Sequence, residues 1–261
     1  FARTRQPGDA DAYCGPGRRQ QIDDTRRQRP LGRLVRVGVG VDPTTSEDGS
    51  GDECGIVVAG IDDLAPTHGY VLADRTVRGG PKAWAAAVVA AYHEFAANFV
   101  VAEGNQGGAL VREVLEAAEA RTRGGAYMPV EIVYASRGKV ARAEPVQMLY
   151  EKGRVHHLGS FAQLEDEQVT WLPGSKSPNR IDALVWIVTA LMLRYFFVAH
   201  QWQKHVRAEA HSRIQALQAR IRPHFLFNSM NTIAALTRSD PKRAEEAVED
   251  LADLFRATLR D

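Results

Sequence analysis

Residues 34–42, LVRVGVGVD, decide the fold class of this chain. Valines stand at every second position of the run and alternate with arginine and glycine, which is the period-2 pattern of a β-strand. Asp42 stands at the expected carboxyl end of this strand. Two further strand-like runs, residues 55–61 and 69–77, follow after turn residues. Consecutive strands therefore open this part of the chain.

Helix and strand patterns then alternate up to about residue 191. The patterns predict helices over residues 82–97, 108–121, 140–150 and 181–191, and strands over 99–102, 130–135 and 154–158. Consecutive strands followed by alternating helices and strands predict an α/β fold, in which a mixed sheet has an antiparallel hairpin at its edge and helices on its faces. This order of elements resembles the ribonuclease H-like order.

The composition limits the possible classes of protein. The 261 residues suffice for one large or two small domains, and 44% hydrophobic with 25% charged residues excludes wholesale disorder. The net charge of +1 gives no global argument for a polyanionic partner, and two cysteines are too few for a disulfide framework. The sequence begins with Phe1 and shows no signal peptide pattern, so we expect a fragment or processed product in a reducing, cytoplasmic compartment.

Residues 1–33 differ in composition from the rest. They contain eight arginines and almost no large apolar residue. This composition predicts a flexible, arginine-rich arm. The arginines are suited to contact phosphate groups, but four aspartates dilute their charge, and a passive tail is the alternative.

Acidic residues stand near the carboxyl ends of the predicted strands, where functional side chains of α/β sheets often lie. Asp42 and Glu103 lie at the ends of predicted strands, and Asp182 lies at the start of a predicted helix. The carboxyl ends of such strands meet in one crevice, and carboxylate oxygens are the ligands that Mg²⁺ or Mn²⁺ prefers. A metal pair roughly 3.5–4 Å apart would activate water for phosphodiester cleavage. Taken singly, each acid is more often a turn or helix-cap residue.

This stretch contains six short motifs: VGVDPT at 39–44, GDECGIVVAG at 51–60, EGNQGG at 103–108, KVARAEPV at 139–146, LYEKGRVHH at 149–157 and SPNRIDALVW at 177–186. In order and spacing they resemble the nuclease domain of the large terminase subunits of tailed phages, over about residues 34–191. The resemblance implies a two-metal-ion endonuclease that cuts concatemeric phage DNA during packaging, in the cytoplasm of a bacterial host. It implies double-stranded DNA, the terminase small subunit and the portal as partners.

The same resemblance implies roles for individual residues. Asp42, Glu103 and Asp182 match the metal-binding carboxylates of the family, and Asp52 is a less secure fourth ligand. Asn179 departs from the pattern, because many relatives carry aspartate there, so a ligand role is not expected at that position.

A local basic cluster is formed by Arg137, Lys139 and Arg142. Such a cluster is suited to contact the DNA backbone without a positive charge on the whole chain, while a solvated helix entry is the alternative. No Gly-x-x-x-x-Gly-Lys-Ser/Thr phosphate loop occurs in the sequence. We therefore expect no ATPase activity and no ATP bound by this chain.

Residues 183–199 form a 17-residue, mostly apolar run that is interrupted by Arg194. The length of the run lies at the lower limit for a membrane span, and Trp202 with several basic residues follows it, as at a membrane interface. A buried helix that closes the sheet explains the first half of the run more simply. Hydropathy alone leaves both alternatives open.

The C-terminal residues carry helical patterns. One apolar stripe runs through residues 204–221, and another follows Pro223 as far as residues 238–239. Asp240 with Pro241 predicts the start of a further helix with heptad-like apolar spacing. Two amphipathic helices joined by a short loop cannot bury both apolar faces alone. We therefore predict an all-α helical hairpin that dimerises into a four-helix bundle.

Residues 217–231, LQARIRPHFLFNSMN, contain the sequence HFLFN. This segment resembles the phosphoacceptor region of sensor histidine kinases of the autolysin and alginate-regulator type, and the resemblance spans about residues 192–261. It implies a phosphorylatable His224, a homodimer through residues 204–261 and a response regulator as partner. The sequence stops at Asp261 before any glycine-rich nucleotide-binding region, so we expect no autophosphorylation in cis.

The two resemblances meet near residues 191–194 without a linker rich in glycine, proline or serine. A nuclease domain fused to a histidine-kinase fragment is the first hypothesis, because the nuclease-like part covers more of the chain. A two-component phosphorelay fragment is the second hypothesis. An inactive chimeric fusion product is the third.

Overall fold

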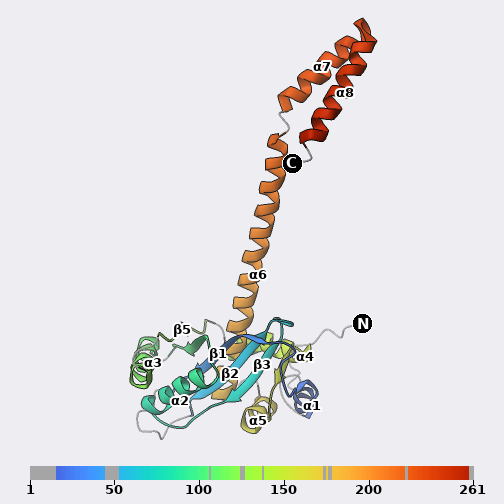
Figure 1. Cartoon of the computed structure of the whole chain (residues 1–261). Helices are drawn as coiled ribbons and strands as arrows, with labels where there is room; N and C mark the ends of the chain where they lie inside the picture. The colour runs from blue at the N-terminus through green and yellow to red at the C-terminus, as the bar shows by residue number, and fades with distance from the viewer. Residues whose placement is uncertain are drawn as a thin grey trace. The chain divides into compact units, whose positions relative to one another are not determined.

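The computed structural model describes residues 16–44, 53–105, 107–123, 127–136, 138–172, 175, 178–220 and 223–258. The chain forms two compact units, residues 1–196 and 197–261 (Figure 1). The long helix α6 (Asn179–Arg220) contributes to both units.

A mixed six-stranded sheet is the centre of the first unit. Its strands are β1 (Leu34–Asp42), β2 (Gly55–Asp62), β3 (Gly69–Asp74), β4 (Phe99–Glu103), β5 (Val130–Val133) and β6 (Val155–His157). They lie in the order β5-β4-β1-β2-β3-β6. The pairs β1–β2 and β2–β3 are antiparallel, and the other neighbours are parallel. The α/β fold with a mixed ribonuclease H-like sheet, predicted from the sequence, is confirmed.

The antiparallel strands lie in the middle of this sheet, and not at its edge as we predicted. The last strand, β6, pairs in parallel with β3 and covers the expected edge. Only 3 residues long, β6 is too short for its pairing partner to be read from an alternating pattern. The helices α4 (Lys139–Glu151) and α5 (Ala162–Thr170) flank it along the chain, and α5 was not predicted.

The two faces of β1 explain its alternating sequence. Val37, Val39 and Val41 pack into a cluster with α2 (Pro81–Glu94) and α3 (Gly108–Arg123). Its glycines face α6, where a Cβ atom on Gly40 would collide with the carbonyl oxygen of Ala183 and with Ile187. Successive side chains of a strand point to opposite faces, so glycine at every second position lets α6 lie directly on the sheet.

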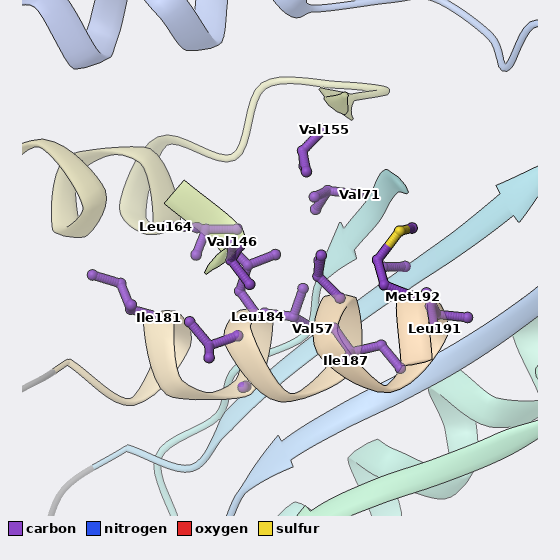
Figure 2. Packing of buried hydrophobic residues seen from close by; sticks show 14 of the residues in the cluster. Val57, Val71, Val146, Val155, Leu164, Ile181, Leu184, Ile187, Leu191 and Met192 are labelled. Carbon is purple, nitrogen blue, oxygen red and sulfur yellow. The ribbon is translucent and has the colours of Figure 1, made fainter. Parts of the chain in front are cut away.

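The second cluster lies between the sheet and α6, and Figure 2 shows its packing at close range. In this cluster, strand residues Val57 and Val71 meet residues from several helices, among which Val146 belongs to α4 and Leu164 to α5. The first turns of α6 contribute Ile181, Leu184, Ile187, Leu191 and Met192. The N-terminal part of α6, residues 181–192, is therefore a core helix of the first unit.

Part of the arm that we predicted to be flexible is ordered. Helix α1 (Pro16–Thr25) buries Ile22 in the second cluster, and just beyond it the Arg27 backbone N–H donates to the His157 carbonyl oxygen at 3.0 Å. The Arg26 guanidinium lies 2.9 Å from the Glu165 carboxylate. Composition did not reveal this, because a single apolar residue and partners far away in the chain hold the helix. Residues 1–15 lie outside the described residues.

Glu165 is the buried centre of this attachment, with 1% of its side chain exposed. Burial alone would raise the pKa of this carboxyl. Hydrogen bonds from His157, Arg26 and the Phe161 backbone N–H outweigh burial and hold the pKa well below its usual range.

We expect Glu165→Gln to lower the free energy of unfolding by about 3 kcal/mol at pH 7, because it leaves the Arg26 charge without its buried partner. The loss should shrink as the pH falls below about 4.3, where a glutamate in the unfolded chain takes up a proton and the wild type loses the same contribution. Urea denaturation measures both. Glu94→Gln, which breaks an exposed pair with Arg75, is the control and should cost under about 1 kcal/mol. Equal losses in the two variants would contradict this expectation.

The second unit consists of helices. Helices α7 (Pro223–Ser239) and α8 (Pro241–Thr258) form the predicted hairpin, and α8 begins at Pro241 as predicted. The Arg243 backbone N–H donates to the Asp240 carboxylate at 3.3 Å, so Asp240 caps the helix. Among the described residues of this unit, only Ala244 is a buried hydrophobic residue. The hairpin therefore has very little core of its own.

One helix in the described part of the chain, at residues 179–213, is long and apolar enough to cross a membrane by length and composition. Half of its most apolar window is buried inside the protein. The buried part lies against the sheet, which agrees with the core helix predicted over residues 181–191. Beyond it, Leu193, Phe196, Phe197 and Trp202 are exposed.

Candidate active site

The alternation of the strands sets the orientation of two acidic side chains. Asp42 follows Gly38 and Gly40 on the face of β1 that α6 covers. Glu103 follows Phe99 and Val101, which also belong to the α6 side of the sheet. Strands β1 and β4 are parallel neighbours, with Val41 opposite Ala102. The two carboxylates therefore lie beside one another at the same end of the sheet.

Asp182 reaches this place from the first turn of α6. The turn is held against the sheet because the Gly40 backbone approaches Ala183 closely. Asp182 is 4% exposed, and its position near a helix N-terminus favours a negative charge. The structure thus brings together the three carboxylates that the sequence singled out.

Burial and the neighbouring charges together change the pKa of Asp42. Burial raises its pKa, and the neighbouring Asp182 and Glu103 raise it further, to about 7. Lys139 and Arg142 act in the opposite direction but do not cancel the effect. Negative charge is therefore in excess at this point, as at a site for a cation.

Asp182 and Glu103 are each paired with basic residues. The Lys139 ammonium lies 2.6 Å from Asp182 Oδ2, and the Arg142 guanidinium lies 3.9 Å from Asp182 Oδ1 and 3.3 Å from Glu103 Oε2. Lys139 remains 46% exposed, whereas Arg142 is 11% exposed. Both residues were candidates for DNA contacts or for a solvated helix entry. Arg142 is neither solvated nor free, since it bridges the two carboxylates.

Sequence reasoning missed two contacts of Glu103. The Trp186 indole N–H donates to Oε2 at 2.8 Å, and the Asn105 amide donates to Oε1 at 2.8 Å. Trp186 stands four residues after Asp182, and a spacing of four places two side chains on the same face of a helix. That spacing was the signal in the sequence that would have pointed to Trp186.

The start of α6 is anchored by a buried arginine that the sequence analysis also missed. Arg180 binds three carboxylates: Asp74 at 3.0 Å, Glu167 at 2.7 Å and Glu53 at 2.5 Å. The neighbouring Asn179 donates to the Glu53 carbonyl oxygen. Asn179 thus serves the local structure, in keeping with the expectation that it is not a metal ligand.

The donors in this crevice suit a hard divalent cation, because carboxylate oxygens are what Mg²⁺ and Mn²⁺ prefer. Among the described residues, no three acidic, histidine or cysteine side chains stand in positions that could hold one ion together. The contacts with Lys139 and Arg142 turn Asp182 and Glu103 toward cationic side chains instead. Asp52 and Arg137 lie outside the described residues. The chemistry of the donor set fits a metal, and the Lys139 ammonium would have to leave Asp182 for that carboxylate to bind one.

His224 lies in the second unit, in the first turn of α7, and its side chain is exposed. The Asn228 amide lies 3.1 Å from His224 Nδ1, one helical turn further along. If the amide donates to Nδ1, the ring carries its proton on Nε2. If the amide is turned so that its oxygen faces Nδ1, then Nδ1 carries the proton and the Nε2 lone pair faces solvent.

Two protein families match this chain, each over a different part. Residues 39–191, more than half of the chain, match the family model of the terminase RNaseH-like domain. The chain belongs to this family. Residues 212–261, which include His224, match the family model of histidine kinases. Both resemblances drawn from the sequence are confirmed.

Similar proteins include sensor histidine kinases. The sensor histidine kinase BtsS of Escherichia coli K12 is 37% identical over 71 residues, which are 27% of this chain and 13% of BtsS. The sensor protein LytS of Streptococcus agalactiae is 49% identical over 49 residues, or 19% of this chain and 8% of LytS. The chain thus spans only a small part of these relatives.

Solved structures similar to this chain include a phage terminase nuclease domain and RuvC. The nuclease domain of the large terminase subunit gp2 of bacterial virus Sf6 is 13% identical, with a TM-score of 0.45 over 65% of this chain and 96% of that domain. The Thermus thermophilus RuvC structure is 16% identical, with a TM-score of 0.39 over 61% of this chain and 96% of RuvC.

Proposed function

We propose that residues 34–191 form a DNA endonuclease that uses Mg²⁺ or Mn²⁺ held by Asp42, Glu103 and Asp182. The observation that carries this proposal is the convergence of these carboxylates on one face of the sheet, where β1 and β4 end. Asp52 is a proposed fourth ligand. A bound pair of ions would supply an activated water and stabilise both oxygens of the phosphodiester exchange.

The chain's own residues divide the remaining work. Lys139 is exposed enough for its ammonium to turn from Asp182 to a DNA phosphate, and we assign backbone binding to it and to Arg137. Arg142 is too buried for that role. Its positive charge instead reduces the repulsion between the Glu103 and Asp182 carboxylates. The family to which the chain belongs suggests double-stranded DNA as the substrate. It also suggests a role in phage DNA packaging, with the terminase small subunit and the portal as partners, in the cytoplasm of a bacterial host.

Cleavage of supercoiled plasmid DNA by the full chain tests this proposal. With Mn²⁺ or Mg²⁺ present, we expect nicked and linear products without sequence preference, and excess EDTA should stop their formation because it removes the ions. Agarose gels measure the rate at which the nicked and linear products form, with the ions alone and with excess EDTA. Cleavage that continues in excess EDTA would reject the assignment. A folded chain that shows no cleavage with either Mn²⁺ or Mg²⁺ would reject it as well.

A second candidate function is that of a phosphoacceptor at His224, and its exposure is the observation that favours it. An imidazole nitrogen is nucleophilic near neutral pH because its reference pKa is about 6.5. Phosphate taken up by His224 would pass to an aspartate of a response regulator. Neither step requires the nuclease-like unit.

A second copy of the chain is the proposed partner of the α7–α8 hairpin. The two helices line a groove with a volume of about 500 Å³, formed in part by Phe225, Ile233, Leu251 and Leu254. Apolar surface of this kind is stabilised when a second hairpin covers it, which gives a four-helix bundle. A homodimer through residues 204–261 would place the two His224 side chains on one bundle.

A further inference from the structure

The carboxylate of Glu103 is surrounded by donors from separate elements. Trp186 of α6 donates to Oε2 at 2.8 Å, and Arg142 of α4 donates to the same oxygen at 3.3 Å. Asn105, just beyond the end of β4, donates to Oε1 at 2.8 Å. The side chain of Glu103 is 12% exposed, so these contacts replace most of its hydration.

The hydrogen bonds to Glu103 occupy most of the acceptor positions of its carboxylate. Each carboxylate oxygen has about two lone-pair positions. On Oε2 both are taken, by Trp186 and Arg142. On Oε1 Asn105 takes one. With respect to the described residues, a single acceptor position on Oε1 therefore remains for a cation.

The orientation of Asn105 is itself determined. The Ala135 backbone N–H donates to Asn105 Oδ1 at 2.9 Å, so this atom must be the amide oxygen. The amide nitrogen therefore faces Glu103, and no alternative orientation of Asn105 satisfies both contacts. Strand β4 and the chain after β5 together fix this donor.

Trp186 has the largest share in this arrangement. Its indole N–H anchors Glu103, and the face of its ring carries the Arg142 guanidinium 4.9 Å from the ring centre. Arg142 in turn approaches Asp182, which lies one turn before Trp186 on α6. One helix thus supplies both a carboxylate ligand and the residue that orients the carboxylate of a neighbouring strand.

We propose that Trp186 is a positioning residue of the nuclease site. Together with Asn105 and Arg142, it holds the Glu103 carboxylate so that Glu103 binds a divalent cation at one point, through Oε1. Groups that hydrogen-bond a metal ligand fix its direction, and their loss typically weakens metal affinity about 10- to 100-fold. This inference rests on the proposed endonuclease function.

Mn²⁺ binding by the full chain, measured by isothermal titration calorimetry, tests the role of Trp186. Trp186→Phe keeps an aromatic ring for Arg142 and removes the indole N–H together with the five-membered ring. We expect the folded variant to bind Mn²⁺ about 10-fold more weakly than the wild type. Trp171→Phe is the matched control, because it removes a buried indole N–H that has no hydrogen-bond partner among the described residues. It should leave Mn²⁺ binding unchanged.

The outcomes separate this inference from the function on which it rests. A wild-type chain that neither binds Mn²⁺ nor cleaves DNA contradicts the endonuclease itself. A wild-type chain that does both, with equal Mn²⁺ affinity in folded Trp186→Phe, overturns only the positioning role. If Trp186→Phe does not fold, the exposed Asn105→Ala decides: weaker Mn²⁺ binding supports the proposal, and unchanged binding overturns it.

Discussion

Replacement of Asp42 by asparagine is expected to abolish metal-dependent DNA cleavage by the full chain. The substitution removes a buried carboxylate that interacts with both Glu103 and Asp182. Loss of a residue that merely supports a ligand costs about 10- to 100-fold, so loss of a ligand should cost more than about 100-fold. Initial rates of plasmid nicking with Mn²⁺ measure the effect.

The stability of the same variant distinguishes lost chemistry from lost structure. Burial and two neighbouring carboxylates make the charge of Asp42 unfavourable in the folded state, which is why its pKa is raised. Its removal should therefore leave the melting temperature unchanged or higher. Asp63→Asn, at the exposed far end of β2, is the control and should cleave like the wild type. Wild-type cleavage by Asp42→Asn would remove Asp42 from the metal site.

Substitution of His224 by glutamine is expected to abolish phosphorylation of the second unit. With ATP alone, this 261-residue sequence should stay unlabelled, because it contains no phosphate loop or glycine-rich nucleotide-binding region. The nucleotide-binding domain of a related kinase, supplied in trans, should label the wild type at an imidazole nitrogen. Radiolabel that is lost in acid and retained in base identifies the phosphohistidine.

A matched variant and an assembly measurement accompany this experiment. His211→Gln changes another exposed histidine and should be labelled like the wild type. Sedimentation should show a dimer for all three chains, since the apolar faces of α7 and α8 need a partner and none of the substitutions removes them. Label that persists in His224→Gln, or a dimeric wild type that an active donor cannot label, would leave the hairpin without a phosphorelay role.

The sequence by itself determined the strands and the ends at which the acids lie. The alternation in residues 34–42 predicts both a strand and its two faces, because successive side chains of a strand point in opposite directions. Asp42 and Glu103 could be placed at one edge, since the carboxyl ends of parallel strands meet there. The start of α8 was predictable because Asp240 and Pro241 act locally on the first helical turn.

The tertiary structure alone decided which side chains meet. Arg26 reaches Glu165 over 139 positions, and Trp186 reaches Glu103 over 83. Periodicity shows which face of an element is buried but not which side chain of another element lies opposite. The spacing of Trp186 from Asp182 therefore indicates a shared helix face, but neither Glu103 nor Glu165 could be predicted as a partner. The same limit applies to α6, whose hydropathy suits a membrane and a protein core equally. The close approach of its first turns to the glycines of β1 made its first half a core helix, and the same approach brings Asp182 to the other carboxylates.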